Sequence, residues 1–178
     1  MSSKFRSVLE ATTNIAVLLM AIAVSAFFLT NYYRQRQVAK APELELGLEK
    51  GLTLPLIQGV NFADSGRTLL IVMNTQCGYC ADSVQFYNRV MDAQVNAKSP
   101  VRILALFPNS GEEVRKFVDE RHLKVDAVSR TDLVKLKLTG TPTLVLVDDA
   151  GRICDFWVGK LTPDNEDQVI KSVTDFRS

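Results

Sequence analysis

The sequence predicts an α/β domain in which helices flank a central mixed sheet, with a transmembrane helix at the N-terminus. Two observations predict the domain. Short apolar runs typical of buried strands alternate with longer helical segments, and the last two runs are joined by a turn and followed by a final helix. This order of elements predicts helices on both faces of the sheet. A third observation predicts the membrane helix, because residues 11–33 contain no charged side chain.

The N-terminal segment is long enough to cross a bilayer. Its 23 residues extend roughly 34 Å as a helix, against a hydrocarbon core of about 30 Å. Tyr32 and Tyr33, followed by Arg34 and Arg36, supply the aromatic and cationic boundary of a membrane surface. A cleaved signal peptide is the alternative, since small residues at 21–26 fit a cleavage site, but the apolar run continues beyond them. We expect an uncleaved signal-anchor, whose orientation the nearly balanced flanking cations do not fix.

The elements of the domain follow from hydrophobic spacing and from residues that favour turns and helix ends. Residues 52–57 and 60–62 predict a small hairpin, and the run Asp-Asp-Ala-Gly at 148–151 predicts a hairpin turn. Pro163 suits the first turn of the last helix, with Thr162 as its cap. Strands are expected over residues 68–73, 101–107, 125–128, 143–147 and 152–158, and helices over 81–97, 111–123, 131–138 and from 163 onward. The chain is thus expected to divide into an N-terminal flank (1–10), the transmembrane signal-anchor helix (11–33), a linker (34–50) and the domain (51–178).

A Cys-Gly-Tyr-Cys motif at residues 77–80 stands where the apolar run 68–73 gives way to a helical segment. This position puts the first sulfur at a helix N-terminus and the second a turn later, which is the geometry of a reversible dithiol. Unpaired N–H groups and the helix dipole favour an anion at Cys77, so we expect its thiol to ionise readily and to be the attacking sulfur. Cys80 would then displace the partner from the mixed disulfide.

Two other roles for these cysteines have less support. Zinc needs about four ligands, which Cys77, Cys80, Cys154 and the single His122 could supply in number. The last two, however, stand alone in separate segments, without the close spacing of a zinc-ligand pair. A purely structural disulfide is disfavoured because so short a loop constrains the unfolded chain little. We therefore expect no metal, and a redox-active Cys77–Cys80 disulfide as the only redox group.

A second motif, Thr141-Pro142, opens the apolar run 143–147, and a proline at the first residue of a strand is placed where its missing N–H does least harm. Together, the Cys-Gly-Tyr-Cys motif after a strand, Gly-Thr-Pro-Thr at 140–143, Asp-Ala-Gly-Arg-Ile at 149–153 and a final helix resemble the thioredoxin fold. The long separation between Cys77 and Pro142 leaves room for an inserted strand and helix, as in the branch of TlpA-type thiol–disulfide oxidoreductases.

That resemblance covers roughly residues 51–176 and carries expectations about the site. It implies that Pro142 is cis and forms part of the active-site wall. It also implies that the backbone of Thr141 pairs with the substrate chain. We further expect Gln76, just before the first cysteine, and Tyr79, between the two cysteines, to contact substrate. Cys77 and Cys80 are expected to be the catalytic residues.

Several positions depart from the pattern of that branch. Gln76 stands where a tryptophan commonly precedes the first cysteine, and Ser83 where a glutamate often follows the second. Ile71 occupies the position at which thioredoxins bury a carboxylate that assists proton transfer. No obvious general base remains. Asp82 could serve weakly, although an acidic residue in a first helical turn is more commonly a partner of the dipole.

The resemblance implies a membrane-anchored thiol–disulfide oxidoreductase on the extracytoplasmic, periplasmic side, exchanging disulfides with exported proteins in cell redox homeostasis. A membrane-embedded electron donor or acceptor would renew the pair, and cytochrome c maturation is one process that uses such a reductant. The sequence does not fix the direction of electron flow. A net charge of +1 gives no bulk charge for binding nucleic acid. The alternative from another class is a catalytically silent module that holds an extended peptide beside Pro142.

Two remaining residues are expected to have ordinary structural roles. His122, near the end of the predicted helix 111–123, is expected to be a solvated partner of the helix dipole. Cys154 lies on a predicted strand near Phe156 and Trp157, where we expect a buried apolar thiol.

Overall fold

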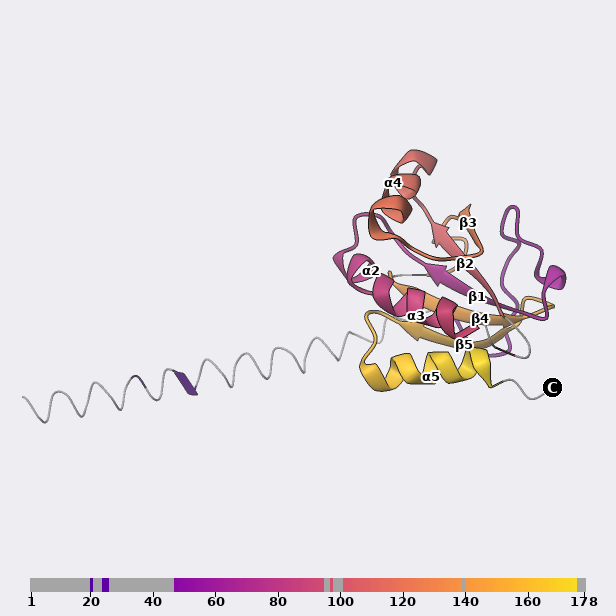
Figure 1. Cartoon of the computed structure of the whole chain (residues 1–178). Coiled ribbons are helices and arrows are strands. Elements are labelled where there is room, and N and C mark those ends of the chain that lie inside the picture. Colours follow the sequence, from indigo (N-terminus) through magenta and orange to yellow (C-terminus); the bar gives the residue numbers. More distant parts are fainter. Residues whose placement is uncertain are drawn as a thin grey trace, which may run out of the picture. The chain divides into compact units, whose positions relative to one another are not determined.

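The structure is a computed structural model of the chain and describes residues 20, 24–25, 47–94, 97, 101–138 and 140–175. The chain divides into two compact units, Met1–Glu45 and Leu46–Ser178. The second unit contains the sheet, the helices that cover it and the two sequence motifs (Figure 1).

A five-stranded mixed sheet forms the centre of this unit, in the order β3-β2-β1-β4-β5. β1 pairs in parallel with β2, and β2 with β3, whereas β4 is antiparallel to both β1 and β5. The carboxyl ends of β1, β2 and β3 therefore meet at one edge of the sheet. The strands are β1 (Arg67–Val72), β2 (Arg102–Phe107), β3 (Ala127–Arg130), β4 (Thr143–Asp148) and β5 (Ile153–Val158).

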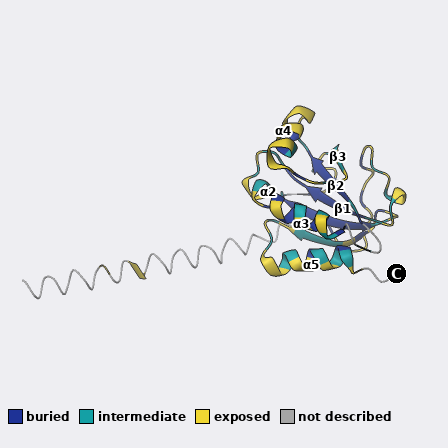
Figure 2. Ribbon diagram, viewed as in Figure 1, coloured by how far each residue is buried: buried dark blue, intermediate teal, exposed yellow. Residues whose placement is uncertain are grey.

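Two hydrophobic clusters cover the two faces of the sheet. Successive side chains of a strand point to opposite faces, so Leu69 and Ile71 of β1 join one cluster while Leu70 and Val72 join the other. The inner strands are buried on both faces (Figure 2). This explains why they read as continuous apolar runs in the sequence.

The helices bury their apolar sides in one of these clusters only. The cluster that contains Leu69 also includes Val90, Phe117 and Val169, which come from three different helices. Figure 1 shows α3 and α5 in front of the sheet. The sequence-based expectation of helices on both faces is therefore wrong for the described residues. The helices are α2 (Gly78–Asp82), α3 (Val84–Gln94), α4 (Gly111–Arg121) and α5 (Pro163–Thr174), with a short 3-10 turn, η1 (Phe62–Asp64).

Irregular chain covers the opposite face instead. Leu54 and Ile57 pack there from the segment in which a hairpin was expected. The only bridge recorded for that segment in the described residues is an isolated one between Thr53 and Arg152. The expected hairpin is absent from residues 52–62 as described, because these residues cover the sheet rather than pair with one another.

The expected helix over 131–138 is a series of turns. Leu136 and Leu138 are both buried in the cluster on the irregular face. Residues two positions apart point in different directions on a helix, so both can reach the sheet only if the chain departs from helical geometry. Lys137, between them, has a left-handed backbone with φ of 54°.

The prediction of a single-pass membrane protein with an extracytoplasmic domain is corrected by the structure. Within the part of the chain that the structure describes, no helix combines the length and the apolar character needed to cross a membrane. Helices α3, α4 and α5 pack their apolar sides against the sheet. The expected span over residues 11–33 lies outside the described residues except at Met20, Val24 and Ser25.

Candidate active site

The candidate active site begins in the loop that follows β1. The Asn74 side chain accepts a hydrogen bond from the N–H of Gln76 (2.9 Å), and the Asn74 carbonyl accepts one from the N–H of Cys77 (3.1 Å). From the loop after β2, Oδ1 of Asn109 accepts a hydrogen bond from the N–H of Thr75 at 3.0 Å. Two asparagine side chains thus hold the loop that carries Cys77 to the start of α2.

Cys77 is the N-cap residue of α2. Its backbone is extended, with φ of −87° and ψ of 113°, and its Sγ accepts a hydrogen bond from the N–H of Cys80 at 3.2 Å. The first N–H groups of a helix lack partners within the helix, so an anion is stabilised at this position. In the thiol form, Sγ also donates to the carbonyl oxygen of Thr141 at 3.3 Å.

The surroundings separate the pKa values of the two thiols. Burial alone would raise the pKa of Cys77, but hydrogen bonds with the side chains of Cys80 and Thr141 and with the backbone of Cys80 and Tyr79 outweigh it. The pKa of Cys77 therefore lies below its ordinary value of 9.0. Cys80 is fully buried, and this burial, together with its hydrogen bond to Cys77, raises its pKa to about 12. Cys77 is thus the sulfur that ionises more readily.

The Thr141-Pro142 motif meets the cysteine motif in space. The peptide bond between Thr141 and Pro142 is cis, as the resemblance implied, and Pro142 is buried. Because β4 is antiparallel to β1, the start of β4 lies beside the end of β1, and Thr143 is paired with Val72. The Pro142 carbonyl accepts a hydrogen bond from the N–H of Gly159 at 2.7 Å, which ties this loop to the end of β5.

The other residues expected to contact substrate lie at the surface beside the cysteines. Tyr79 is 53% exposed, and Gln76 is also exposed. Asp82, considered as a weak base, forms an exposed ion pair with Lys160 at 2.9 Å. That pair links α2 to the loop before α5. Ile71, at the position of the family's buried carboxylate, lies in the hydrophobic core.

Three polar residues around the site were not found from the sequence. Asn74 and Asn109 fix the loop before Cys77, and Lys160 pairs with Asp82. The available signal for Asn109 was its place just after an expected strand, because the carboxyl ends of parallel strands lie at one edge. To place Asn109 beside the cysteine loop, however, one must know that β1 pairs with β2, and the spacing of apolar residues within a segment does not reveal that pairing.

The remaining cysteine and histidine lie apart from this site. Cys154 is exposed, so the expectation of a buried thiol is wrong. His122 is exposed and is the C-cap of α4, with a left-handed φ of 53°. Cys77, Cys80 and Cys154 are all free thiols. Among the described residues, no group of three or more His, Cys, Asp and Glu side chains is arranged to hold a metal ion.

No protein-family model matches the sequence, and no curated protein matches it. Solved structures do resemble the fold. The thioredoxin domain of a thiol-disulfide oxidoreductase from Bacteroides vulgatus has a TM-score of 0.56 at 17% identity, covering 71% of this chain and 99% of that one. A protein described as the thiol:disulfide interchange protein DsbE from Chlorobium tepidum has a TM-score of 0.55 at 22% identity, with 71% and 96% covered.

A third similar structure is a thiol:disulfide interchange protein from a Bacteroides species, with a TM-score of 0.54 at 18% identity, covering 74% of this chain and 93% of that one. At such identities, likeness establishes the fold alone. The domain therefore has the thioredoxin-like α/β fold, with a five-stranded mixed sheet.

Proposed function

We propose that this protein is a thiol–disulfide oxidoreductase that exchanges disulfides with other proteins through Cys77 and Cys80. The observation that carries the proposal is the placement of Cys77 Sγ at the N-cap of α2, where it accepts the Cys80 N–H while Cys80 itself is buried. The three similar structures bear the names of thiol–disulfide oxidoreductases or interchange proteins, which supports the proposal.

In the reducing direction, the Cys77 thiolate attacks one sulfur of a client disulfide. A bond forms between Cys77 and that sulfur, the client disulfide breaks, and the second client sulfur leaves as a thiolate that takes up a proton. Cys80 then loses its proton and attacks the Cys77 sulfur, which releases the first client sulfur as a thiol. The client has gained two electrons and two protons, and Cys77 and Cys80 are joined by a disulfide. Oxidation of a client is the reverse sequence.

The differing pKa values suit these two roles. A thiolate is the nucleophile in disulfide exchange, so the lowered pKa of Cys77 favours the first step. The raised pKa of Cys80 keeps its proton in place until the mixed disulfide has formed. In this proposal the Thr141 carbonyl, already within hydrogen-bond distance of Cys77 Sγ, accepts an N–H from the client backbone, while Tyr79 and Gln76 contact the client surface.

The partners of the proposed reaction are protein thiols or disulfides and a second redox partner that restores the pair. Cytochrome c maturation and the identity of that partner stay predictions. The direction of transfer depends on the reduction potential of the Cys77–Cys80 pair. Equilibration of the full-length protein with glutathione buffers measures it. A potential near about −270 mV would indicate a reductant, and one near about −120 mV an oxidant.

Replacement of Cys77 by serine tests the activity itself. We expect Cys77→Ser to lower the rate at which the protein reduces insulin disulfides by at least about a hundredfold, because no other sulfur has these surroundings. Cys154→Ser is the matched control, since it also removes one thiol. Full activity in Cys77→Ser would contradict the proposal. An absence of exchange in the unsubstituted protein, combined with intact peptide binding, would favour the silent binding module instead.

A further inference from the structure

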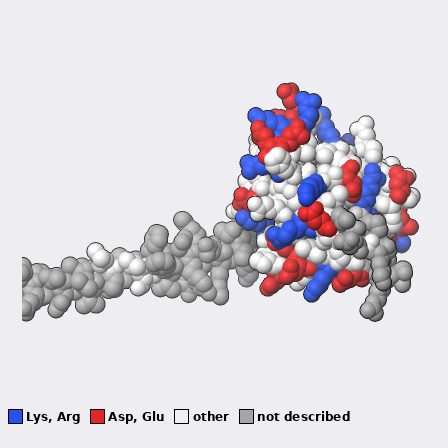
Figure 3. Space-filling view, in the orientation of Figure 1, with Lys and Arg blue, Asp and Glu red and all other residues white. Residues whose placement is uncertain are grey.

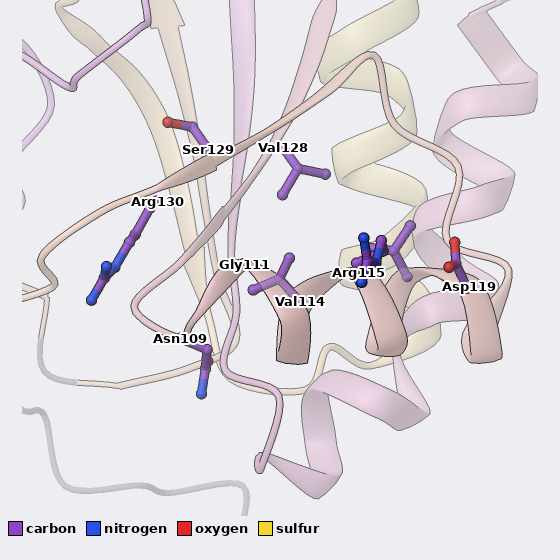
Figure 4. Close-up of a pocket in the computed structure, with 9 residues that line it drawn as sticks. Asn109, Gly111, Val114, Arg115, Asp119, Val128, Ser129 and Arg130 are labelled. Atoms are coloured by element: carbon purple, nitrogen blue, oxygen red, sulfur yellow. The ribbon is translucent and has the colours of Figure 1, made fainter.

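A cavity of about 370 Å³ lies between α4 and β3. Val114 and Val118 of α4 and Val128 of β3 line it with apolar side chains, and Figure 4 shows Val114 and Val128 directed into the space between helix and strand. Val128 is 43% exposed although it is apolar. Ligand pockets typically enclose roughly 300 to 1,000 Å³. The space is therefore sufficient for a large apolar side chain from another molecule.

Charged side chains stand at the rim of this cavity. Arg115 and Arg130 contribute two cations and Asp119 one carboxylate. Within the described residues, neither guanidinium takes part in an ion pair. Figure 3 shows charges of both signs interspersed over α4. Arg115 and Asp119 both lie on α4, whereas Arg130 ends β3, so Arg130 is the rim cation set apart from the Asp119 carboxylate.

Among the described residues, no strand pairs with the outer side of β3, which borders the cavity, although the Ser129 hydroxyl donates a hydrogen bond to the Gln58 carbonyl at 3.0 Å. In the described part of the chain, β3 pairs with β2 alone and lies at the end of the sheet. The backbone groups on its outer side can therefore pair with an added strand. Peptide-binding domains that add a strand gain affinity from such backbone hydrogen bonds, and they gain selectivity from pockets for side chains.

The groove formed by this cavity and the outer side of β3 is linked to the candidate active site through Asn109. β1, β2 and β3 are parallel, so Cys77, Asn109 and Arg130 all lie at or just beyond the carboxyl ends of their strands. Asn109 both lines the cavity and accepts the Thr75 N–H in the loop that carries Cys77. A chain that reacts at Cys77 can therefore continue from that loop along β3.

We infer that this groove binds an extended segment of the client polypeptide, as a strand added to β3, while the client sulfur reacts at Cys77. An apolar client side chain occupies the cavity and a client carboxylate pairs with Arg130. The inference rests on the proposed function and specifies which client polypeptides the oxidoreductase would bind. Selection among clients then comes from the groove, since the chemistry at Cys77 involves only sulfur atoms.

The test uses the full-length protein with Cys80→Ser and Cys154→Ser, which leaves Cys77 as its single thiol. This protein is mixed with a library of peptides. Each peptide contains one cysteine with randomised residues on both sides, and that cysteine is activated as a mixed disulfide with thionitrobenzoate. The Cys77 thiolate attacks the peptide sulfur, a Cys77–peptide disulfide forms, and thionitrobenzoate leaves as a coloured thiolate. Mass spectrometry then identifies the attached peptides.

We expect peptides with an apolar and an acidic residue on one side of the cysteine to be enriched about tenfold, which corresponds to about 1.4 kcal/mol. Val128→Lys should abolish the enrichment, and Arg130→Gln should remove only the acidic preference. Val134→Lys is the matched control and should leave it unchanged, because Val134 is 81% exposed and does not line the cavity.

Each contrary outcome has a distinct meaning. Equal enrichment in Val128→Lys and its parent would overturn the inference and leave the proposed function intact. A parent that sediments as a dimer, with Val128→Lys as a monomer, would assign the groove to a second copy of this chain and also overturn it. Failure of Cys77 to release thionitrobenzoate even from the free dithiobis reagent would refute the proposed function itself.

Discussion

The start of α2 and strand β5 each carry a cysteine, and they surround it in opposite ways. Cys77 is half-buried, and its sulfur accepts an N–H at 3.2 Å. Cys154 is exposed on an edge strand, where its sulfur lies 3.8 Å from the Arg152 carbonyl, a group that can only accept a hydrogen bond. Exposure makes a thiol accessible, but donors that face the sulfur stabilise its thiolate. Accessibility and reactivity are therefore separate properties in this molecule.

The largest expected effect is the trapping of clients by Cys80→Ser. With the resolving sulfur removed, a mixed disulfide at Cys77 loses its internal exit, so covalent adducts should accumulate and last at least about a hundred times longer. Non-reducing electrophoresis of cell extracts measures the adducts, which should disappear after reduction. The protein with both Cys77→Ser and Cys80→Ser is the control. Adducts that persist in this control would come from Cys154 and would show that the exposed cysteine, rather than Cys77, is the one that reacts with clients.

The second prediction concerns the order in which the three thiols are alkylated as pH rises. Only the thiolate reacts. Because the pKa of Cys77 is lowered from 9.0, its rate should reach half-maximum below pH 9.0. The pKa of Cys80 is raised to about 12, so the thiol stays protonated and unreactive until strongly alkaline pH.

Mass spectrometry after brief treatment of the reduced protein with iodoacetamide gives the site of each label. At mildly acidic pH, Cys77 should carry more label than Cys154, despite its lower exposure. Preferential labelling of Cys154 would show that access outweighs the hydrogen bonds at α2. Labelling of Cys80 before Cys77 would reverse the assigned roles.

A smaller effect is expected from Asn109→Ala. The substitution removes the acceptor of the Thr75 N–H and should lower the free energy of unfolding by about 1 kcal/mol. It should also move the pKa of Cys77 upward toward 9.0, because a loosened loop no longer fixes the sulfur at the cap. Ultraviolet absorbance of the thiolate as a function of pH measures that pKa.

Asn88→Ala is the matched control for this experiment. The Asn88 side chain, on α3, donates a hydrogen bond to the His122 carbonyl and accepts one from the Lys124 N–H, and neither partner belongs to the loop that carries Cys77. It should lower stability without moving the pKa of Cys77. If both variants leave that pKa in place, Asn109 has a structural role only.

The smallest expected effect is that of Cys154→Ser. Among the described residues no group donates a hydrogen bond to the Cys154 sulfur, so this thiol should not contribute to exchange at Cys77, and the rate of insulin reduction should change less than about twofold. Thermal unfolding confirms that the variant is folded. A larger loss of exchange would place Cys154 in the reaction and remove the contrast between the two regions.

Local patterns in the sequence, together with the family resemblance, were sufficient for the central parts of the site. The residues around Cys77 predict a helix start, and Thr141-Pro142 predicts a strand start, but it was the resemblance to the thioredoxin fold that implied a place for Pro142 in the active-site wall. Asn109 could not be assigned to the site in this way, because its contact with Thr75 depends on the pairing of β1 with β2. Spacing within one segment carries no information about that pairing.

The errors in the fold have related physical causes. Leu136 and Leu138 suit a helix by composition, yet both are needed to cover the sheet, and tertiary packing overrides local propensity. Cys154 follows Ile153, which is buried in the cluster on the irregular face. Strand alternation turns Cys154 toward Lys171 and Ser172 in the last turn of α5. There the thiol is exposed. The apolar residues of its strand had suggested a buried position.

The contact between Cys77 and Thr141 spans 64 positions along the chain. A ribosome therefore produces both cysteines of the motif well before the carbonyl that faces the first of them. Until β4 has been made and has docked beside β1, Cys77 lacks the contact with Thr141 that helps to lower its pKa. The surroundings that separate Cys77 from Cys80 are thus complete only when synthesis has passed β4, and a product truncated before Thr141 would carry the motif without that contact.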